Sequence, residues 1–217
     1  GVELILNIPY LPYARADRRF TEGDCLGLET LGRLLRLGNF DKINVLDVHN
    51  PNAAFTHVSS FLRNYPAMPF IQRAAEDFKP DAVLFPDEGA AKRYAHTGFP
   101  SVFAAKERDP ATGKLSGFKV PDVSRYERIL VVDDICDGGG TFLGITGAIP
   151  PGPTFGLYVT HGIFSQGMKP LADIFSAIYT TNSYQDFPLN DARCPLLTVY
   201  DAWEAFGEKQ QRGETPR

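Results

Sequence analysis

A chain of 217 residues can bury one large hydrophobic core or two small ones. Its 43% hydrophobic and 22% charged residues are the proportions of an ordinary globular protein, and no apolar run approaches the ~20 residues that a membrane span needs. The net charge of −4 excludes a broad basic surface for nucleic acid, so any binding of phosphate must be local.

The N-terminus begins directly with a predicted strand over residues 2–8, and no signal peptide is recognisable. A domain that opens on a buried strand is expected to lack a segment before it. We therefore interpret the chain as an excised or unusually short version of a longer protein.

Residues 9–24 form a predicted loop that is rich in arginine and aromatic residues: Arg15, Arg18, Arg19, Tyr10, Tyr13 and Phe20. A solvated charged loop is one interpretation, slightly favoured when the loop is considered alone. The other is a clamp for the polyphosphate of a nucleotide, because guanidinium groups match phosphate oxygens and aromatic rings can flank a base.

A helix and a strand are predicted next. Asp24 can cap a helix that extends to about residue 37 and carries leucines on one face. A strand over residues 43–48 leads directly to His49. A histidine in such a position is usually packed and hydrogen-bonded. Here it shares a strand edge with the arginine loop, at the place where open α/β sheets bind ligands.

Strands and helices alternate from residue 61 onward. Helices are predicted at residues 69–78 and 89–95, and strands at residues 82–85 and 102–105. Asp87 follows the first of these strands. Residues 106–114 form a predicted polar loop, which is either a lid over a site or a mobile basic loop without a role.

The segment 129–141 carries the most informative pattern. Four aliphatic residues, 129–132, predict a strand buried on both faces, and Asp133 and Asp134 are expected where this strand leaves its sheet. Three glycines, 138–140, allow a sharp turn that brings backbone N–H groups close to a ligand, and a short helix is expected from Thr141. Acids for hydroxyl groups and amides for a phosphate together predict a site for a phosphorylated sugar. For any one of these features alone, a solvated turn between strand and helix is the alternative.

Three further strands, at residues 155–160, 175–180 and 196–199, and a helix at residues 201–206 complete the pattern. The cysteines Cys25, Cys136 and Cys194 are an odd number without metal-ligand spacing, which indicates reduced thiols in a cytoplasmic protein. Cys136 has no histidine near it in sequence, so it is interpreted as a structural residue of the loop rather than a nucleophile.

The string from Ile129 to Thr141 resembles the motif of the type I phosphoribosyltransferase fold that binds 5-phosphoribosyl 1-diphosphate (PRPP). Pro-Tyr-x-x-Tyr-Ala-Arg-x-Asp-Arg-Arg at residues 9–19, followed by Asp-Val-His at 47–49, is similar to the ribose-phosphate pyrophosphokinase family. The resemblance includes Phe-Pro-Asp-Glu-Gly at 85–89, Lys106-x-Arg108, and Tyr-Val-Thr-His-Gly-Ile-Phe-Ser at 158–165. It runs in register from residue 2 to about residue 206.

The resemblance implies an α/β protein of two phosphoribosyltransferase-like lobes with mostly parallel sheets, the first incomplete at its N-terminus. The expected ATP-binding lobe comprises residues 1–58 with 195–217. The expected lobe for PRPP or ribose 5-phosphate comprises residues 59–194.

The resemblance also implies the reaction: the diphosphoryl group of ATP is transferred to the 1-hydroxyl of ribose 5-phosphate, giving PRPP and AMP, with Mg²⁺ as cofactor. Lys106, Arg108 and His49 would be catalytic. ATP would be bound by Arg15, Asp17, Arg18 and His49, and the metal by His49 and Asp87. Ribose 5-phosphate would be bound by Asp133, Asp134, Asp137, Gly138, Gly139, Gly140 and Thr141. A homo-oligomer that binds neither nucleic acid nor membranes is expected.

The chain departs from the family pattern at several positions. The family's N-terminal segment, with its ATP-contacting acidic loop, is not represented, and the segment after His49 is shorter. Ala16, Ala90 and Gly138 stand where Gln, Gly and often Thr are usual. Two rivals stay open: a non-catalytic regulatory subunit of the same family, and a phosphoribosyltransferase that consumes PRPP. The arginine loop and the Asp-x-His motif count against the second.

Overall fold

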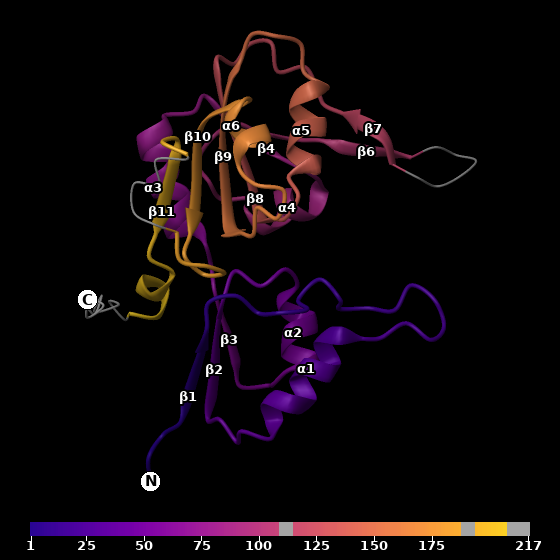
Figure 1. The fold of residues 1–217 in the computed structure, drawn as a ribbon, viewed down its shortest axis with the longest axis vertical. Coiled ribbons are helices and arrows are strands. Elements are labelled where there is room, and N and C mark those ends of the chain that lie inside the picture. The colour runs from indigo at the N-terminus through magenta and orange to yellow at the C-terminus, as the bar shows by residue number, and fades with distance from the viewer. Residues whose placement is uncertain (109–114, 188–193, 208–217) are drawn as a thin grey trace. The chain divides into compact units, whose positions relative to one another are not determined.

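The computed structural model describes residues 1–108, 115–187 and 194–207, and the chain forms two compact units (Figure 1). Unit 1 comprises Gly1–Ala67 and Asp201–Arg217, and unit 2 comprises Met68–Tyr200. Unit 2 is therefore inserted into unit 1 between its third strand and its last helical turn.

Unit 1 is built on a three-stranded parallel sheet in the order β1-β2-β3 (Figure 1). The strands are β1 (Ile5–Ile8), β2 (Lys42–Leu46) and β3 (Leu62–Tyr65), and the helices are α1 (Gly27–Arg36), α2 (Pro51–His57) and the 3-10 helix η1 (Ala202–Phe206). Buried aliphatic residues of β2, such as Ile43 and Val45, share a core with Leu28 of α1 and Ala54 of α2.

Several boundaries in unit 1 differ from the expected ones. Asp24 does not cap α1, because its carboxylate accepts hydrogen bonds from the N–H groups of Phe20 and Thr21 in its own loop. Helix α2 was not predicted. It begins where Asn50 accepts the N–H of Ala53 at 3.2 Å and where Pro51 supplies a residue suited to a first helical turn.

Unit 2 contains a six-stranded parallel sheet in the order β11-β10-β9-β8-β4-β5. Its strands are β4 (Ala82–Phe85), β5 (Ser101–Phe103), β8 (Arg128–Cys136), β9 (Thr154–Gly162), β10 (Phe175–Thr181) and β11 (Leu197–Tyr200). Its helices are α3 (Met68–Phe78), α4 (Glu88–Arg93), α5 (Gly140–Gly147) and α6 (Lys169–Ala172). The parallel pairings in both units confirm the predicted α/β class with mostly parallel sheets.

Helices cover the large sheet on both faces. Phe142 and Ile145 of α5 share a core cluster with Val131 of β8 on one face. On the other face, the ring of Phe85 stacks on Tyr94 at the end of α4, with ring centroids 6.3 Å apart. The central strands are thus buried on both sides, which explains their continuous aliphatic runs.

Two expectations for unit 2 were wrong in their boundaries. Strand β8 extends to Cys136, so Asp133 and Asp134 lie within the strand rather than after it. Lys106 and Arg108 belong to β6 (Ala105–Arg108), which pairs antiparallel with β7 (Leu115–Lys119) in a ribbon that extends away from the main sheet (Figure 1). The rest of the predicted polar loop, residues 109–114, lies outside the described residues.

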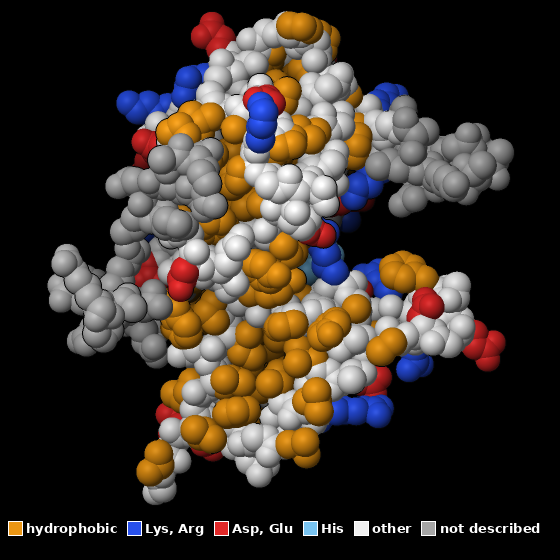
Figure 2. All heavy atoms as spheres, in the orientation of Figure 1, with side chains coloured by type: hydrophobic (Ala, Val, Ile, Leu, Met, Phe, Trp, Pro, Cys, Tyr) orange, Lys and Arg blue, Asp and Glu red, His pale blue; other side chains and the backbone are white. Residues whose placement is uncertain are grey.

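Hydrophobic side chains also gather on the visible surface of unit 1 (Figure 2). The exposed large hydrophobic residues of this unit are Val2, Leu4, Ile5, Tyr13, Phe20, Leu34, Leu37, Phe55 and Phe61. Leu34 is one of the leucines of the predicted apolar face of α1, but it is exposed, because the face that α1 buries is centred on Leu28.

Candidate functional site

A glycine turn connects β8 to α5 at the carboxyl edge of the large sheet. Gly139 adopts φ 79°, in the left-handed region, and precedes the first residue of α5. A Cβ at this position would also lie 3.2 Å from Cδ2 of Leu171, so both conformation and space favour glycine. The N–H of Ser165 donates to the carbonyl of Asp137 at 3.1 Å, which ties the turn to the segment after β9. The turn therefore presents backbone at a helix start, as a phosphate site requires.

The two acids at the end of β8 are buried, with 8% of Asp133 and 2% of Asp134 exposed. The N–H of Asp134 donates to Oδ1 of Asp133 at 2.9 Å. Oδ2 of Asp134 lies 3.1 Å from Nη1 of Arg93, which is also mostly buried. The acids lie three and four residues before the glycine turn, so carboxylates and backbone amides meet at one edge of the sheet.

Asp87 follows β4 at the same edge and is bonded from two sides. Its Oδ1 accepts the N–H of Ala90 at 3.0 Å and so caps α4, and its Oδ2 lies 3.1 Å from Nζ of Lys106. Partial burial raises the pKa of the Asp87 carboxyl, but the hydrogen bonds from Ala90, Lys106 and Gly89 outweigh it and leave the pKa below its usual value. Asp87 is therefore ionised at neutral pH and able to bind a cation.

Cys136, beside the turn, is fully buried. Burial, with the nearby charges of Asp133 and Asp137, raises the pKa of its thiol to about 12. The thiol is neutral at physiological pH, which agrees with a structural residue rather than a nucleophile.

In unit 1, the buried carboxylate of Asp17 joins the arginine loop to the start of α2. It accepts two hydrogen bonds from Arg18, at 2.8 and 3.0 Å, and one from Nδ2 of Asn50 at 2.6 Å. The hydrogen bond from Arg18 is the main cause that lowers the pKa of Asp17. Burial opposes it, and Asn50 and the nearby His49 add to it. Arg18 is thus held in the position from which it reaches solvent.

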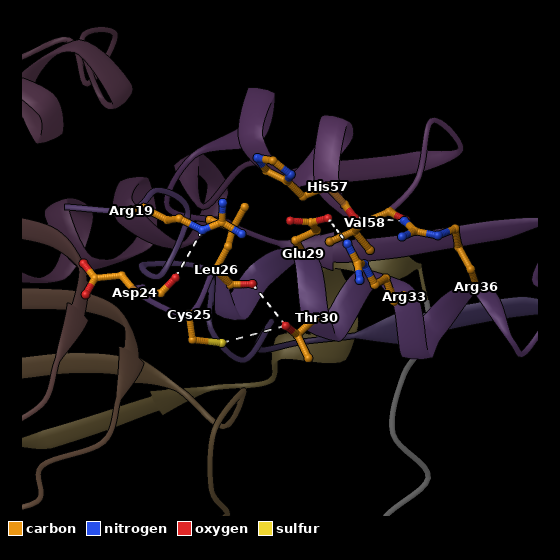
Figure 3. A network of polar contacts seen from close by, with 10 residues as sticks. All are labelled: Arg19, Asp24, Cys25, Leu26, Glu29, Thr30, Arg33, Arg36, His57 and Val58. Atoms are coloured by element: carbon orange, nitrogen blue, oxygen red, sulfur yellow. Dashed lines mark hydrogen bonds and ion pairs between the residues drawn. The ribbon is translucent and has the colours of Figure 1, made fainter. Parts of the chain in front are cut away.

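The C-terminal part of the arginine loop is fastened to α1 (Figure 3). Nε of Arg19 donates to the carbonyl of Asp24 at 3.1 Å, and the Thr30 hydroxyl contacts Sγ of Cys25 at 3.9 Å. At the far end of α1, Arg36 donates to the carbonyls of His57 and Val58, which joins α1 to the end of α2. The first two contacts restrain the end of the loop before α1, and the bonds of Arg36 hold α1 against α2.

The predicted site residues fall into two groups. Unit 1 contains Arg15, Asp17, Arg18 and His49. Unit 2 contains Asp87, Lys106, Asp133, Asp134, Asp137, Gly138, Gly139, Gly140 and Thr141. Arg108 lies on β6, and its side chain lies outside the described part of the chain.

Sequence reasoning did not assign roles to Arg93 and Asn50. Both sit in segments that resemble the family or border them, but the only signal for a role is their side-chain contacts with Asp134 and Asp17. Within the described ranges, no group of three or more His, Cys, Asp or Glu side chains is arranged so that it could hold a metal ion. Within the same ranges, no helix has the length and apolar character needed to cross a membrane.

No family model matches the chain. The chain is 32% identical to a protein named ribose-phosphate pyrophosphokinase from Pyrococcus abyssi, over 96% of this chain and 73% of that relative. It is 27% identical to a protein of the same name from Saccharolobus solfataricus, over 66% of this chain and 51% of the relative. A third, from Pyrococcus furiosus, is 26% identical over 83% of this chain and 67% of the relative.

One solved structure, of phosphoribosylpyrophosphate synthetase from Mycobacterium smegmatis, matches the fold with a TM-score of 0.76. The match covers 94% of this chain and 70% of that chain at 22% sequence identity. At this identity the match supports the fold alone.

Proposed function

The chain belongs to the ribose-phosphate pyrophosphokinase family, and on that premise we propose that it makes PRPP. In the proposed reaction, the 1-hydroxyl of ribose 5-phosphate attacks the β-phosphorus of ATP. The bond from this phosphorus to the AMP oxygen breaks, and AMP leaves. The hydroxyl loses its proton to solvent or to a basic group.

The observation that carries the proposal is similarity over 96% of the chain to a single relative. That alignment includes unit 1, with the arginine loop and the Asp-x-His motif, as well as unit 2 with its glycine turn. A phosphoribosyltransferase would need the glycine turn but not the arginine loop, so similarity over both units favours synthesis of PRPP.

In unit 2, the glycine turn from Asp137 to Thr141 would hold the 5-phosphate through backbone N–H groups. This role is supported by the left-handed Gly139 at the start of α5. The acid pair at the end of β8 would supply a carboxylate for the ribose hydroxyls, because ionised carboxylates accept strong hydrogen bonds from hydroxyl groups.

In unit 1, Arg15 and Arg18 would bind the ATP phosphates. Asp17 would take part by holding the guanidinium of Arg18, since its carboxylate already accepts two bonds from that group. His49, which follows β2 closely and is half-buried, would contact the nucleotide or its metal.

The residues present fit Mg²⁺. This ion is usually held by one or two carboxylates together with substrate phosphates and waters, rather than by a cage of side chains. Asp87 is an ionised carboxylate at the carboxyl edge of the sheet, where the glycine turn also lies. When bound, Mg²⁺ would neutralise part of the charge of the ATP phosphates.

Lys106 would act on the transferring group. In this structure, its Nζ forms an ion pair with Oδ2 of Asp87 at 3.1 Å. A lysine that is poised beside the phosphates can stabilise the charge that develops in the transition state. Arg108, two residues further along β6, would add a second positive charge.

The test is to incubate the full chain with Mg-ATP and ribose 5-phosphate and to follow the products by phosphorus NMR. We expect AMP and PRPP in equal amounts, with no AMP when ribose 5-phosphate is left out. Absence of AMP under all conditions would support the regulatory-subunit alternative. Release of pyrophosphate from PRPP and a nucleobase, without PRPP synthesis, would support the transferase.

A further inference from the structure

Arg93 and Asp134 form an ion pair in the interior of unit 2. The side chains are 16% and 3% exposed, and Nη1 lies 3.1 Å from Oδ2. Exposed ion pairs contribute little, but breaking a buried pair is strongly unfavourable because one charge stays behind without its partner. This ion pair, which is a charge contact rather than a hydrogen bond, joins Asp134 to the end of α4.

The acid pair is divided between the two faces of the sheet. Side chains alternate along a strand, so Asp133 continues the row of Ile129 and Val131. That row packs in the core cluster that contains Phe142 of α5. Asp133 also pairs in register with Val159 of β9, which belongs to the same cluster.

Asp134 faces the other way. It continues the row of Leu130 and Val132. Leu130 pairs with Val83 of β4, and Phe85, two residues after Val83, stacks on Tyr94 at the end of α4. The ion pair with Arg93 agrees with this direction, because Arg93 is the last residue of α4.

We propose that Arg93 is a positioning residue: it holds Asp134 on the α4 side, and this orients Asp133 as the acid that binds the ribose of the substrate. The two acids then have different roles, one toward the ligand and one toward the protein. The backbone N–H of Asp134 donates to Oδ1 of Asp133, so the stretch of backbone that Arg93 anchors through the Asp134 side chain also orients Asp133. The inference rests on the proposed function, which supplies ribose 5-phosphate as the ligand.

Helix α4 adds a reason for this arrangement. It begins at the cap formed by Asp87, which also contacts Lys106, and it ends at Arg93. A single short helix thereby connects the Asp87–Lys106 pair to the acid pair of β8. Through Arg93, the position of the ribose-binding acid is linked to that of the carboxylate proposed to bind Mg²⁺.

The test measures binding of ribose 5-phosphate to the full chain by calorimetry, together with the melting temperature. Asp133→Asn should weaken binding by about 10- to 100-fold, the size of a lost charge-assisted hydrogen bond, with little change in melting temperature. Asp134→Asn and Arg93→Met should each weaken binding by a smaller factor, on the order of fivefold, and lower the melting temperature. The double variant should bind like either single variant and should recover part of the melting temperature.

Lys92→Met is the matched control. Lys92 lies on the same helix and loses the same charge, but its pair with Glu88 is exposed, so neither binding nor melting should change. If Arg93→Met does not fold, the comparison of Asp134→Asn with the double variant carries the test.

Three results would overturn the inference. One is an effect of Asp134→Asn as large as that of Asp133→Asn while Arg93→Met binds normally, which would mean that Asp134 contacts the ligand itself. The second is a loss of affinity in the double variant that equals the product of the losses in Asp134→Asn and Arg93→Met, which would mean that the two residues act independently. The third is absence of ribose 5-phosphate binding in the wild type. Binding without formation of PRPP would overturn only the proposed function.

Discussion

Asp17 shows how one buried carboxylate can organise a loop. It bonds to Arg18 beside it and to Asn50 at the start of α2, so the arginine loop and the segment after His49 share one acceptor. Asn50 also accepts the N–H of Ala53 through its Oδ1. Its amide therefore serves the helix with one atom and Asp17 with the other.

This arrangement predicts a pH-dependent stability. The folded state lowers the pKa of Asp17, mainly through Arg18. Ionisation of Asp17 therefore stabilises the fold at neutral pH, and this contribution is lost as pH falls below ~4 toward the folded-state pKa. Asp17→Asn should cost about 1–3 kcal/mol in the free energy of unfolding at pH 7, and its difference from the wild type should shrink below pH 4.

The only tryptophan of the chain, Trp203, lies in unit 1, so its fluorescence in urea reports on the affected unit. Glu22→Gln makes the same charge change at an exposed position of the same loop and should have no effect. A constant difference between Asp17→Asn and the wild type from pH 7 to pH 3 would contradict the assignment.

At the level of single residues, the sequence predicts candidate site residues, but it does not predict which side chains hold them in place. Acids at or near the end of an apolar strand form a distinctive local pattern, which is why Asp87, Asp133 and Asp134 could be recognised as candidates from the sequence. Arg93 could not, because a basic residue in the last turn of a helix is ordinary, and its partner is 41 residues away in sequence (134 − 93 = 41). Such contacts depend on the packing of α4 against β8, which no local pattern reports.

Among the elements, the turn before α5 is the one whose backbone is most constrained. Gly139→Ala should destabilise unit 2 by about 1–2 kcal/mol, because a side chain at positive φ is strained and this one would also press on Leu171. Gly147→Ala, at the other end of α5, meets nothing within 4 Å and should leave the stability unchanged or raise it slightly. Thermal unfolding followed by circular dichroism distinguishes the two variants, and equal melting temperatures would refute the strain argument.

The β6–β7 ribbon is the second element with a testable role. The Lys106–Asp87 pair is partly exposed, so Lys106→Ala should cost little stability. If Lys106 stabilises only the transition state, kcat for PRPP synthesis should fall by about 10² while KM for both substrates is unchanged. Lys119→Ala removes the same charge from the partner strand and should retain normal kcat.

A rise in KM with normal kcat for Lys106→Ala would instead make Lys106 a residue of ground-state binding. The ribbon itself was missed in the sequence, where the same segment was interpreted as a loop. Its polar composition lacks the alternation of a half-buried strand, and β6 and β7 pair only with each other as a separate two-stranded sheet. The buried strands β4 and β10 were located closely because they are covered on both faces and are continuously apolar.

On the scale of the whole molecule, unit 2 is a continuous segment whose core residues, from Ala82 to Leu197, all belong to that unit. Residues 68–200 expressed alone should therefore fold, show cooperative thermal unfolding and bind ribose 5-phosphate without making PRPP. Calorimetry and circular dichroism on the purified segment test this directly. A segment that is unfolded, or that binds only when residues 1–67 are added, would show that unit 2 depends on unit 1.

Because unit 2 is inserted into unit 1, the order in which the two units begin to be translated differs from the order in which they can finish folding. The ring of Phe206, in η1, packs edge-on against Tyr65 of β3 at a centroid distance of 5.2 Å, yet a whole unit is translated between them. On the ribosome, β1 to β3 emerge first but must wait for η1, while unit 2 can fold in the interval. The unit whose translation starts first is thus the last to be finished. A premature stop shortly before residue 202 would damage the N-terminal half of the molecule rather than the half that was just made.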